Sequence, residues 1–125
     1  MVIIDTSTLI DYLRRPQENS PFKEFINQDR KEMLAISILT IQELYVGKSS
    51  KEVKREGFFL NIVSKMKILQ YNYQIAQLAG ELTRDYHTNF DFADAAIAAT
   101  AILNKAKFFT LNKKDFKGIK GLKLI

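Results

Sequence analysis

The sequence predicts an α/β fold in which a central parallel sheet of four to five strands is flanked by helices on both faces. Short apolar runs of strand length alternate with longer segments of helical spacing. This alternation is typical of parallel sheets that are covered on both sides. The chain has 125 residues, of which 46% are hydrophobic, so it can form one packed core but not two. We therefore expect a single domain over residues 1–125.

Five segments have the length and composition of strands. The first, Val2–Ile4, is a run of β-branched residues that ends at Asp5, which indicates a buried strand. The other four are less uniformly apolar, but they lie between segments with helical spacing. They are expected at residues 33–38, 68–69, 107–111 and 122–125.

Capping residues mark where several helices begin. Ser7 and Ser20 precede two of them, and Thr40 with Glu43 has the spacing of a capping box. Asp91 precedes a strongly apolar, alanine-rich helix and is expected to cap it. The expected helices cover residues 8–14, 21–28, 40–46, 51–66, 73–86 and 92–104.

The composition restricts the chemistry of any metal site. The chain has no cysteine and one histidine, His87, which we expect at the surface. The ligands of a metal ion would therefore be mainly oxygen atoms, which suit Mg²⁺ or Mn²⁺ better than Zn²⁺. The absence of cysteine also agrees with a cytoplasmic protein. The sequence lacks both an apolar run of the ~20 residues that a bilayer span needs and an opening segment typical of a secretory signal.

Positive charge is concentrated near the end of the sequence. Residues 105–125 contain seven lysines and one acid, Asp115, whereas residues 1–104 contain twelve basic and thirteen acidic residues. A basic segment of this kind binds a polyanion in some proteins and is only a solvated surface in others. Charge alone leaves both interpretations open.

Four acidic residues are expected at one edge of the sheet. Asp5 ends the first strand, Glu43 lies in the first turn of the helix after the second, and Asp115 follows the fourth. Asp94 lies in the first turn of the alanine-rich helix, whose amino end faces the same edge in a right-handed crossover. Carboxylates that converge repel one another unless a cation is present. A divalent metal beside lysines that hold a polyanion is the chemistry of a phosphodiesterase.

Each acid also has a structural explanation. Asp5 can cap a turn, and Glu43 can complete the capping box. Asp94 can stabilise the first turn of its helix through the helix dipole, and Asp115 can be an ordinary loop residue. No single acid decides between the two interpretations.

Four segments, taken in order, carry a family resemblance. They are Ile4–Ile10 (IDTSTLI), Ser37–Leu44 (SILTIQEL, followed by Gly47), Asp94–Ala101 (DAAIAATA) and Phe109–Phe116 (FTLNKKDF). Each resembles one of the successive motifs of PIN-domain ribonucleases, especially the VapC toxins of prokaryotic toxin–antitoxin pairs. One such motif is weak, but four in this order over nearly the whole chain are specific.

The resemblance implies an activity and two partners. The activity is Mg²⁺- or Mn²⁺-dependent endonuclease cleavage of RNA. The partners are a second copy of the chain, in a homodimer, and a cognate antitoxin that inserts a segment near the active site and blocks it.

The resemblance also assigns roles to residues. Carried over by position, Asp5, Glu43 and Asp94 match the metal-binding acids. The fourth acid varies within the family; Asn112 stands where many members have an acid, and we favour Asp115 as the fourth acid, with Asn112 hydrogen-bonding in the site. The hydroxyl of Thr6 matches a position that orients a ligand or water. The candidates for RNA binding are Lys113, Lys114 and Arg14.

The sequence supports three other functions less well. A catalytically silent PIN-like module that binds RNA or a partner is disfavoured by the complete set of acids. A phosphoacceptor receiver domain carries paired acids after its first strand, but here Asp5 is followed by Thr-Ser-Thr, and the third strand ends in Gln70-Tyr71-Asn72. A dinucleotide-binding fold is disfavoured because no Gly-x-Gly-x-x-Gly follows the first strand.

Overall fold

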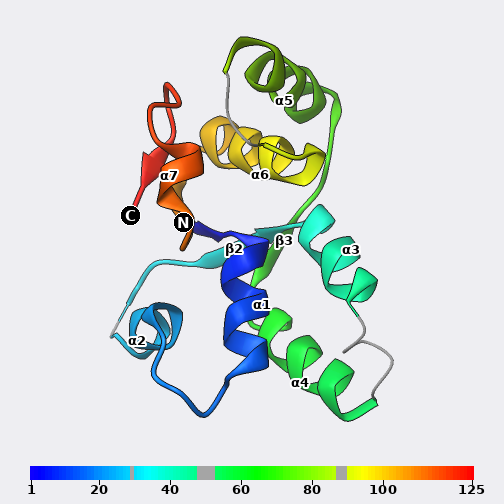
Figure 1. Ribbon diagram of the computed structural model, residues 1–125, viewed down its shortest axis with the longest axis vertical. Coiled ribbons are helices and arrows are strands. Elements are labelled where there is room, and N and C mark those ends of the chain that lie inside the picture. The colour runs from blue at the N-terminus through cyan, green and yellow to red at the C-terminus, as the bar shows by residue number, and fades with distance from the viewer. Residues whose placement is uncertain (29, 48–52, 87–89) are drawn as a thin grey trace.

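Five short parallel strands form the sheet of the computed structural model, in the order β3-β2-β1-β4-β5 (Figure 1). The structure describes residues 1–28, 30–47, 53–86 and 90–125. The predicted parallel sheet is thus confirmed. Three strands are shorter than expected, the first has the expected bounds, and the third is one residue longer. The strands are β1 (Val2–Ile4), β2 (Leu34–Ser37), β3 (Lys67–Leu69), β4 (Lys107–Phe109) and β5 (Lys123–Leu124).

Strand β1 lies at the centre because all three of its residues are apolar and fully buried. Successive side chains of a strand point to opposite faces. Ile3 therefore joins the core on one face of the sheet, whereas Val2 and Ile4 join the core on the other. The short run Val2–Ile4 connects both layers of the molecule.

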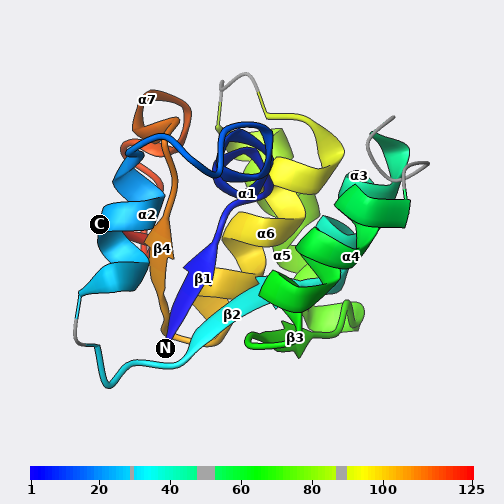
Figure 2. The same cartoon turned by 90° about the horizontal axis from the view of Figure 1, so that it is seen from below.

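Helices cover both faces of the sheet, as predicted. Helices α5 and α6 lie on one face, and α1, α2 and α4 lie on the other (Figure 2). Helix α3 packs against both α1 and α6. The bounds are α1 (Thr6–Arg14), α2 (Pro21–Asn27), α3 (Ile38–Val46), α4 (Val53–Val63), α5 (Tyr73–Asp85), α6 (Phe92–Leu103) and α7 (Lys113–Phe116).

Two of the predicted caps are confirmed. The side chain of Ser20 accepts a hydrogen bond from the N–H of Lys23 at the start of α2. The side chain of Asp91 accepts one from the N–H of Asp94 at the start of α6.

Two other predicted helix starts are wrong. Helix α1 begins at Thr6, and Ser7 does not cap it because the Ser7 hydroxyl donates to the carboxylate of Asp5 instead. Helix α3 begins at Ile38, and its cap is Ser37, whose hydroxyl accepts from the N–H of Leu39. The predicted Thr40–Glu43 capping box is therefore absent from the start of α3.

Two further helices differ from expectation. Helix α4 ends at Val63 rather than near residue 66, and the first residues predicted for it, 51 and 52, lie outside the described ranges. Helix α7 was not predicted, since a four-residue helix shows no periodicity; it is anchored by the buried side chain of Phe116. No helix in the described ranges is both long enough and apolar enough to cross a membrane.

The order of the strands creates a switch point at β1. The chain leaves β1 to form β2 and β3 on one side, and it returns later to place β4 on the other side. In open parallel sheets, ligands bind beyond the carboxyl ends of the strands at such a point. The residues that follow β1 and β4 are therefore the first place to look for a site.

Replacement of Phe116 by alanine tests whether α7 is anchored as described. The ring is 1% exposed and lies 4.9 Å from that of Phe108, between centroids. Its loss should lower the free energy of unfolding by about 3–5 kcal/mol, measured by urea denaturation. Val46→Ala is the control, since Val46 is 79% exposed and should cost within about 0.5 kcal/mol. Equal costs would contradict the described packing.

Candidate active site

Asp5 lies at the switch point, between the end of β1 and the start of α1, and is only 3% exposed. Its Oδ2 atom accepts hydrogen bonds from the hydroxyls of Ser7 (2.6 Å) and Thr110 (2.8 Å). Thr110 is buried directly after β4. The residues that follow β1 and β4 therefore meet at this carboxylate. Burial raises the pKa of Asp5, although the two hydroxyl hydrogen bonds lower it in part.

Glu43 reaches the same edge from the middle of α3. The hydroxyl of Thr6 donates to Glu43 Oε1 at 2.8 Å and also shares a hydrogen bond with the buried hydroxyl of Thr40 at 2.9 Å. Burial raises the pKa of Glu43, and the charges of Asp91 and Asp5 add to the effect. The side chain of Glu43 thus serves the site and not the start of its own helix.

Asp94 faces the other acids from the first turn of α6. It forms a true capping box with Asp91: Asp91 Oδ1 accepts from the Asp94 N–H at 2.8 Å, and Asp94 Oδ2 accepts from the Asp91 N–H at 3.2 Å. Burial raises the pKa of Asp94 to about 6, and the charges of Asp91, Asp5 and Glu43 add to the effect. Its structural and electrostatic roles therefore coexist.

Four acids lie close enough at one edge of the sheet for their charges to repel one another. They are Asp5, Glu43, Asp91 and Asp94. Among the described residues, no lysine or arginine forms an ion pair with any of them. In those same ranges no three acids already stand in an arrangement that could hold a metal ion. That Asp5, Glu43 and Asp94 share one ion stays a prediction, and it requires their side chains to move closer.

Asn112 and Asp115 are connected to the site through Thr110. The side-chain amide of Asn112 donates to the carboxylate of Asp115, and the backbone N–H of Asn112 donates to the Thr110 hydroxyl at 3.0 Å. Asn112 is therefore linked to Asp5 through Thr110. Asp115 is not among the groups whose charge raises the pKa of Asp5, Glu43 or Asp94. Its assignment as the fourth acid stays a prediction.

Sequence reasoning missed four residues of this site. Ser7 and Thr110 hydrogen-bond to Asp5, Thr40 contacts Thr6, and Asp91 adds a fourth charge. A signal existed for Thr110, which follows the strand expected to end at the same edge as β1. His87 lies outside the described residues, so its predicted surface position is not tested.

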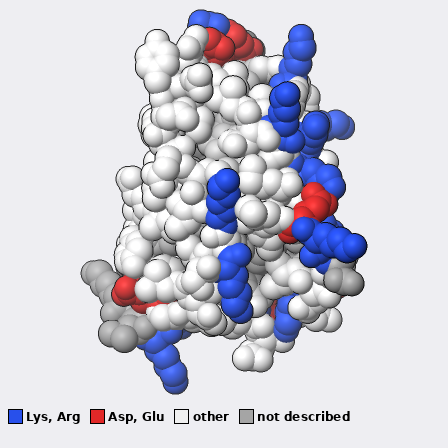
Figure 3. Space-filling view, turned by 180° about the vertical axis from the view of Figure 1, so that it is seen from behind, with Lys and Arg blue, Asp and Glu red and all other residues white. Residues whose placement is uncertain are grey.

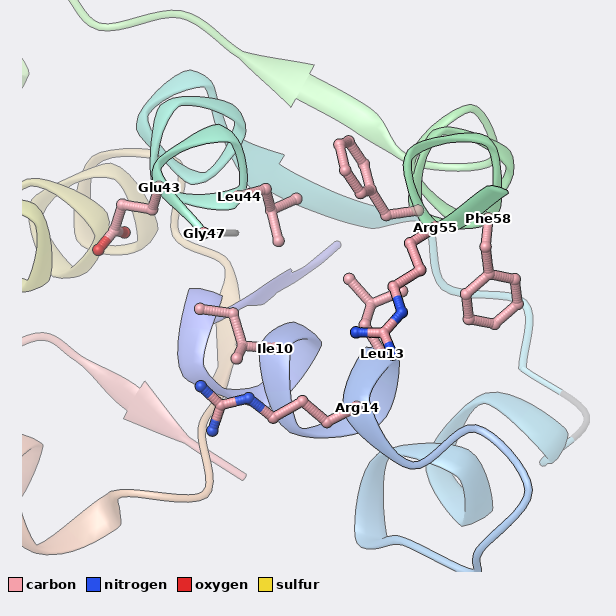
Figure 4. Close-up of a pocket in the computed structure, with 9 residues that line it drawn as sticks. Ile10, Leu13, Arg14, Glu43, Leu44, Gly47, Arg55 and Phe58 are labelled. Atoms are coloured by element: carbon pink, nitrogen blue, oxygen red, sulfur yellow. The ribbon is translucent and has the colours of Figure 1, made fainter. Parts of the chain in front are cut away.

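The candidate RNA-binding residues are exposed, at the end of α1 and on α7. Arg14 lines a hollow of about 310 Å³ between α1, α3 and α4, and Glu43 stands at one side of it (Figure 4). Lys113 and Lys114 are exposed on α7. Lysine and arginine side chains gather on the side of the molecule that carries α7 and the C-terminal residues (Figure 3).

The raised pKa of Asp94 predicts how pH affects the metal-free protein. Folding favours the protonated carboxyl, so the stability from this group is full below its ordinary pKa of 3.8 and is lost as the pH rises through about 6. Asp94→Asn removes the charge and keeps a hydrogen-bond acceptor for the capping box. It should raise the melting temperature most above pH 6, and progressively less toward pH 4.

The matched control for this prediction is Asp85→Asn. Asp85 is exposed, and hydrogen bonds from Arg84 lower its pKa, so its replacement should not stabilise the protein at any pH. Thermal melts in a chelating buffer measure both variants. An Asp94→Asn protein that is no more stable than the parent at pH 7.5 would contradict the described repulsion.

The chain matches the PIN domain family over residues 2–122. It is similar to ribonuclease VapC19 of Mycobacterium tuberculosis, with 35% identity over 121 residues that cover 93% of this chain and 92% of the relative. It is also similar to ribonuclease VapC1 of Rickettsia felis, with 29% identity over 99% of this chain and 94% of the relative.

Solved structures have the same fold. A toxin–antitoxin complex from Klebsiella pneumoniae contains a chain with a TM-score of 0.78 and 28% identity, covering 100% of this chain and 96% of that one. The DNA-bound VapBC2 of Rickettsia felis gives a TM-score of 0.84 over 100% and 98% of the two chains, at 23% identity. With its sheet order, its acidic edge and a match over nearly its whole length, this chain belongs to the PIN-domain family.

Proposed function

We propose that this chain is a divalent-metal-dependent endoribonuclease and the toxin of a VapBC-type toxin–antitoxin pair, with residues 1–125 acting as one nuclease domain. The observation that carries the proposal is the set of acids beyond the carboxyl ends of β1 and β4. Burial raises the pKa of three of them, and no basic residue in the described ranges neutralises them. The named ribonuclease relatives support it.

The donor chemistry of the acids fits Mg²⁺ or Mn²⁺. Carboxylate oxygens are the ligands that these hard cations prefer. A divalent cation would compensate the burial that raises the pKa values and the repulsion that adds to it. We propose that Asp5, Glu43 and Asp94 hold the ion, with Asp115 as a fourth acid and Asn112 as a hydrogen-bonding neighbour. When bound, such an ion lowers the pKa of a water ligand and neutralises charge that develops on a phosphoryl group.

The protein's own contribution is to hold the acids in position before RNA arrives. Ser7 and Thr110 fix the carboxylate of Asp5, and Thr6 fixes that of Glu43. The capping box fixes Asp94 at the start of α6. Each carboxylate is thus oriented by a hydrogen bond that comes from a rigid element or from its immediate flank, which limits how far the acids must reorganise when the ion binds.

The basic surface near α7 supplies the affinity for RNA in this proposal. Lys113 and Lys114 follow β4 and lie beyond the same edge of the sheet as the acids. Lysines at such a place hold phosphates and contribute no chemistry. Arg14, at the end of α1, has the same proposed role. We also propose that the protein is located in the cytoplasm.

Two protein partners complete the proposal. The hollow beside Glu43 has apolar walls from Ile10, Leu13 and Phe58 (Figure 4), and we propose that a segment of a cognate antitoxin occupies it. The similarity to toxin–antitoxin complexes supports such a partner. A homodimer is proposed as well; Tyr73 and Phe92, which are 82% and 74% exposed near the starts of α5 and α6, offer an apolar surface for a second copy.

Conservative replacement of the acids tests the catalytic proposal. Asp94→Asn and Glu43→Gln keep the size and the hydrogen-bond acceptor of each side chain but remove the charge that would hold the ion. Cleavage of a fluorescent RNA with Mg²⁺ or Mn²⁺ should fall by orders of magnitude. Asp85→Asn, which removes an exposed acid elsewhere, should cut at the parent rate. A folded variant of Asp94 or Glu43 that still cuts at the parent rate would show that its carboxylate is structural.

Neutralisation of two lysines tests the RNA-binding surface. The double variant Lys113→Ala, Lys114→Ala should bind RNA more weakly and with a flatter dependence on salt, because fewer counterions are released when it binds. Each lost phosphate contact should reduce the slope of log affinity against log salt by about 0.7 for single-stranded RNA. The slope is measured by fluorescence anisotropy with the Asp94→Asn background. An unchanged slope would mean that these lysines are only a solvated surface.

A further inference from the structure

The segment between α7 and β5 follows a three-residue pattern of an apolar residue, a lysine and a glycine. It reads Phe116-Lys117-Gly118, Ile119-Lys120-Gly121 and Leu122-Lys123. The first two apolar residues are buried and the third packs against the same core, whereas all three lysines are exposed. The pattern thus turns the apolar side chains inward and presents a lysine row to solvent, formed by Lys117, Lys120 and Lys123.

Two consecutive turns produce this alternation. Lys117 has φ −65° and ψ 135°, and Gly118 has φ +86°, which agree with a type II turn. The N–H of its fourth residue, Ile119, donates to the carbonyl of its first at 3.5 Å. The next turn, from Ile119 to Leu122, has Gly121 at φ +87° and closes at 3.2 Å. Each turn spans less than about 7 Å between its end Cα atoms, so the lysines follow one another in short, regular steps.

The lysine row leads from the acidic edge of the sheet to the opposite edge. It starts directly after α7, whose Lys113 and Lys114 lie beyond the carboxyl end of β4. Its last member, Lys123, begins β5 and pairs in register with Lys107, the first residue of β4. The two edges are separated by the three residues of β4, roughly 10 Å at the usual rise of a strand. Lysine and arginine side chains line this side of the molecule (Figure 3).

The lysines of the row have no ion-pair partner in the described ranges. Among the lysines after residue 104, only Lys107 forms an ion pair in those ranges, with Glu32 at 2.7 Å. Lys123 lies beside Lys107 in the register of the sheet, so both side chains leave the same face. Like charges in such neighbouring positions are unfavourable. A polyanion bound along the row would compensate them.

We propose that the lysine row binds the phosphate backbone of the RNA substrate between the acidic edge and the opposite edge of the sheet. Lysines hold phosphates without reading bases. Because a stacked strand advances by about 3.4 Å per nucleotide, the row accommodates roughly three nucleotides beyond those held at α7. The inference rests on the proposed nuclease function and deepens it: the substrate is an RNA that extends along the protein on one side of the cut, not a short fragment.

Replacement of two lysines at the far end of the row tests the proposal by binding. The row variant, Lys120→Gln with Lys123→Gln, removes two charges but keeps most of each side chain, and both residues are exposed. With a single-stranded RNA long enough to reach both edges, the slope of log affinity against log salt should become flatter by about 1.4, the sum of two phosphate contacts. Fluorescence anisotropy in a chelating buffer measures the slope while metal-dependent cleavage is prevented.

The matched control is Lys65→Gln with Lys67→Gln. Both lysines are exposed, and they lie beside or in β3, the strand farthest from β5 in the sheet. This variant loses the same charge and should keep the parent's slope. An unchanged slope in the row variant, or an equal change in the control, would overturn the proposal and point to a solvated surface or to a protein partner.

Cleavage of shortened substrates tests the path of the RNA. An RNA that the parent cuts is trimmed nucleotide by nucleotide on either side of the cut. On the full RNA, the row variant should have a kcat/KM roughly tenfold lower than the parent at low salt, because two phosphate contacts are lost. This difference should vanish once trimming on one side leaves too few nucleotides to reach the row.

The two measurements separate the row from the nuclease activity. A difference in kcat/KM that does not depend on RNA length would overturn the proposed path. If the parent cuts no RNA but the binding slopes differ as expected, the nuclease proposal fails and the row stands as an RNA-binding surface.

Discussion

The burial of the Asp5 carboxylate is the constraint on which the rest of the site depends. An ionised carboxylate with almost no access to water costs free energy unless hydrogen bonds or a cation compensate it. One of its two hydroxyl donors, Thr110, reaches it only because β4 pairs in parallel with β1. The Asp5 N–H in turn donates to the carbonyl of Phe109 at 2.9 Å, so the ladder of the sheet continues into the site. The order of the strands, more than any local motif, therefore assembles the acidic edge.

The acids oppose the stability that the two cores provide. Glu43 and Asp94 come from different helices, yet the charge of Glu43 adds to the raised pKa of Asp94, so the folded metal-free protein holds repulsion that the unfolded chain lacks. The cores on either side of β1 are apolar and separate from this edge. A protein that keeps such a cluster of acids is less stable than it would be without them. Such a loss of stability is typical of active sites. Relief of the repulsion by a cation would couple metal binding to stability.

The sequence allowed most of the sheet to be predicted because strands such as Val2–Ile4 are apolar runs between clear helical periods. The starts of two helices could not be predicted. Ser7 and Ser37 both lie at the start of a helix. The hydroxyl of Ser7 donates to the carboxylate of Asp5, whereas that of Ser37 caps α3. Local spacing does not distinguish these choices, because the competing acceptor at Asp5 is held in place by tertiary structure. The three main acids were predicted from their places after strands and in family motifs; the charge of Asp91, expected only as a cap, was not.

The capping box of Asp91 and Asp94 shows why structural and functional explanations of an acid are not exclusive. Capping needs only an oxygen that accepts from a backbone N–H, and asparagine serves about as well as aspartate at a helix start. Carboxylates here cap α6 while standing near Asp5 and Glu43, where each added negative charge is unfavourable. The hydrogen bonds of the cap explain the oxygen atoms, and the helix dipole favours some negative charge at this end of α6, but neither explains why the charges of Asp5 and Glu43 lie beside it. The excess charge is what a divalent cation would require, and it is the part of this helix start that the fold alone leaves unexplained.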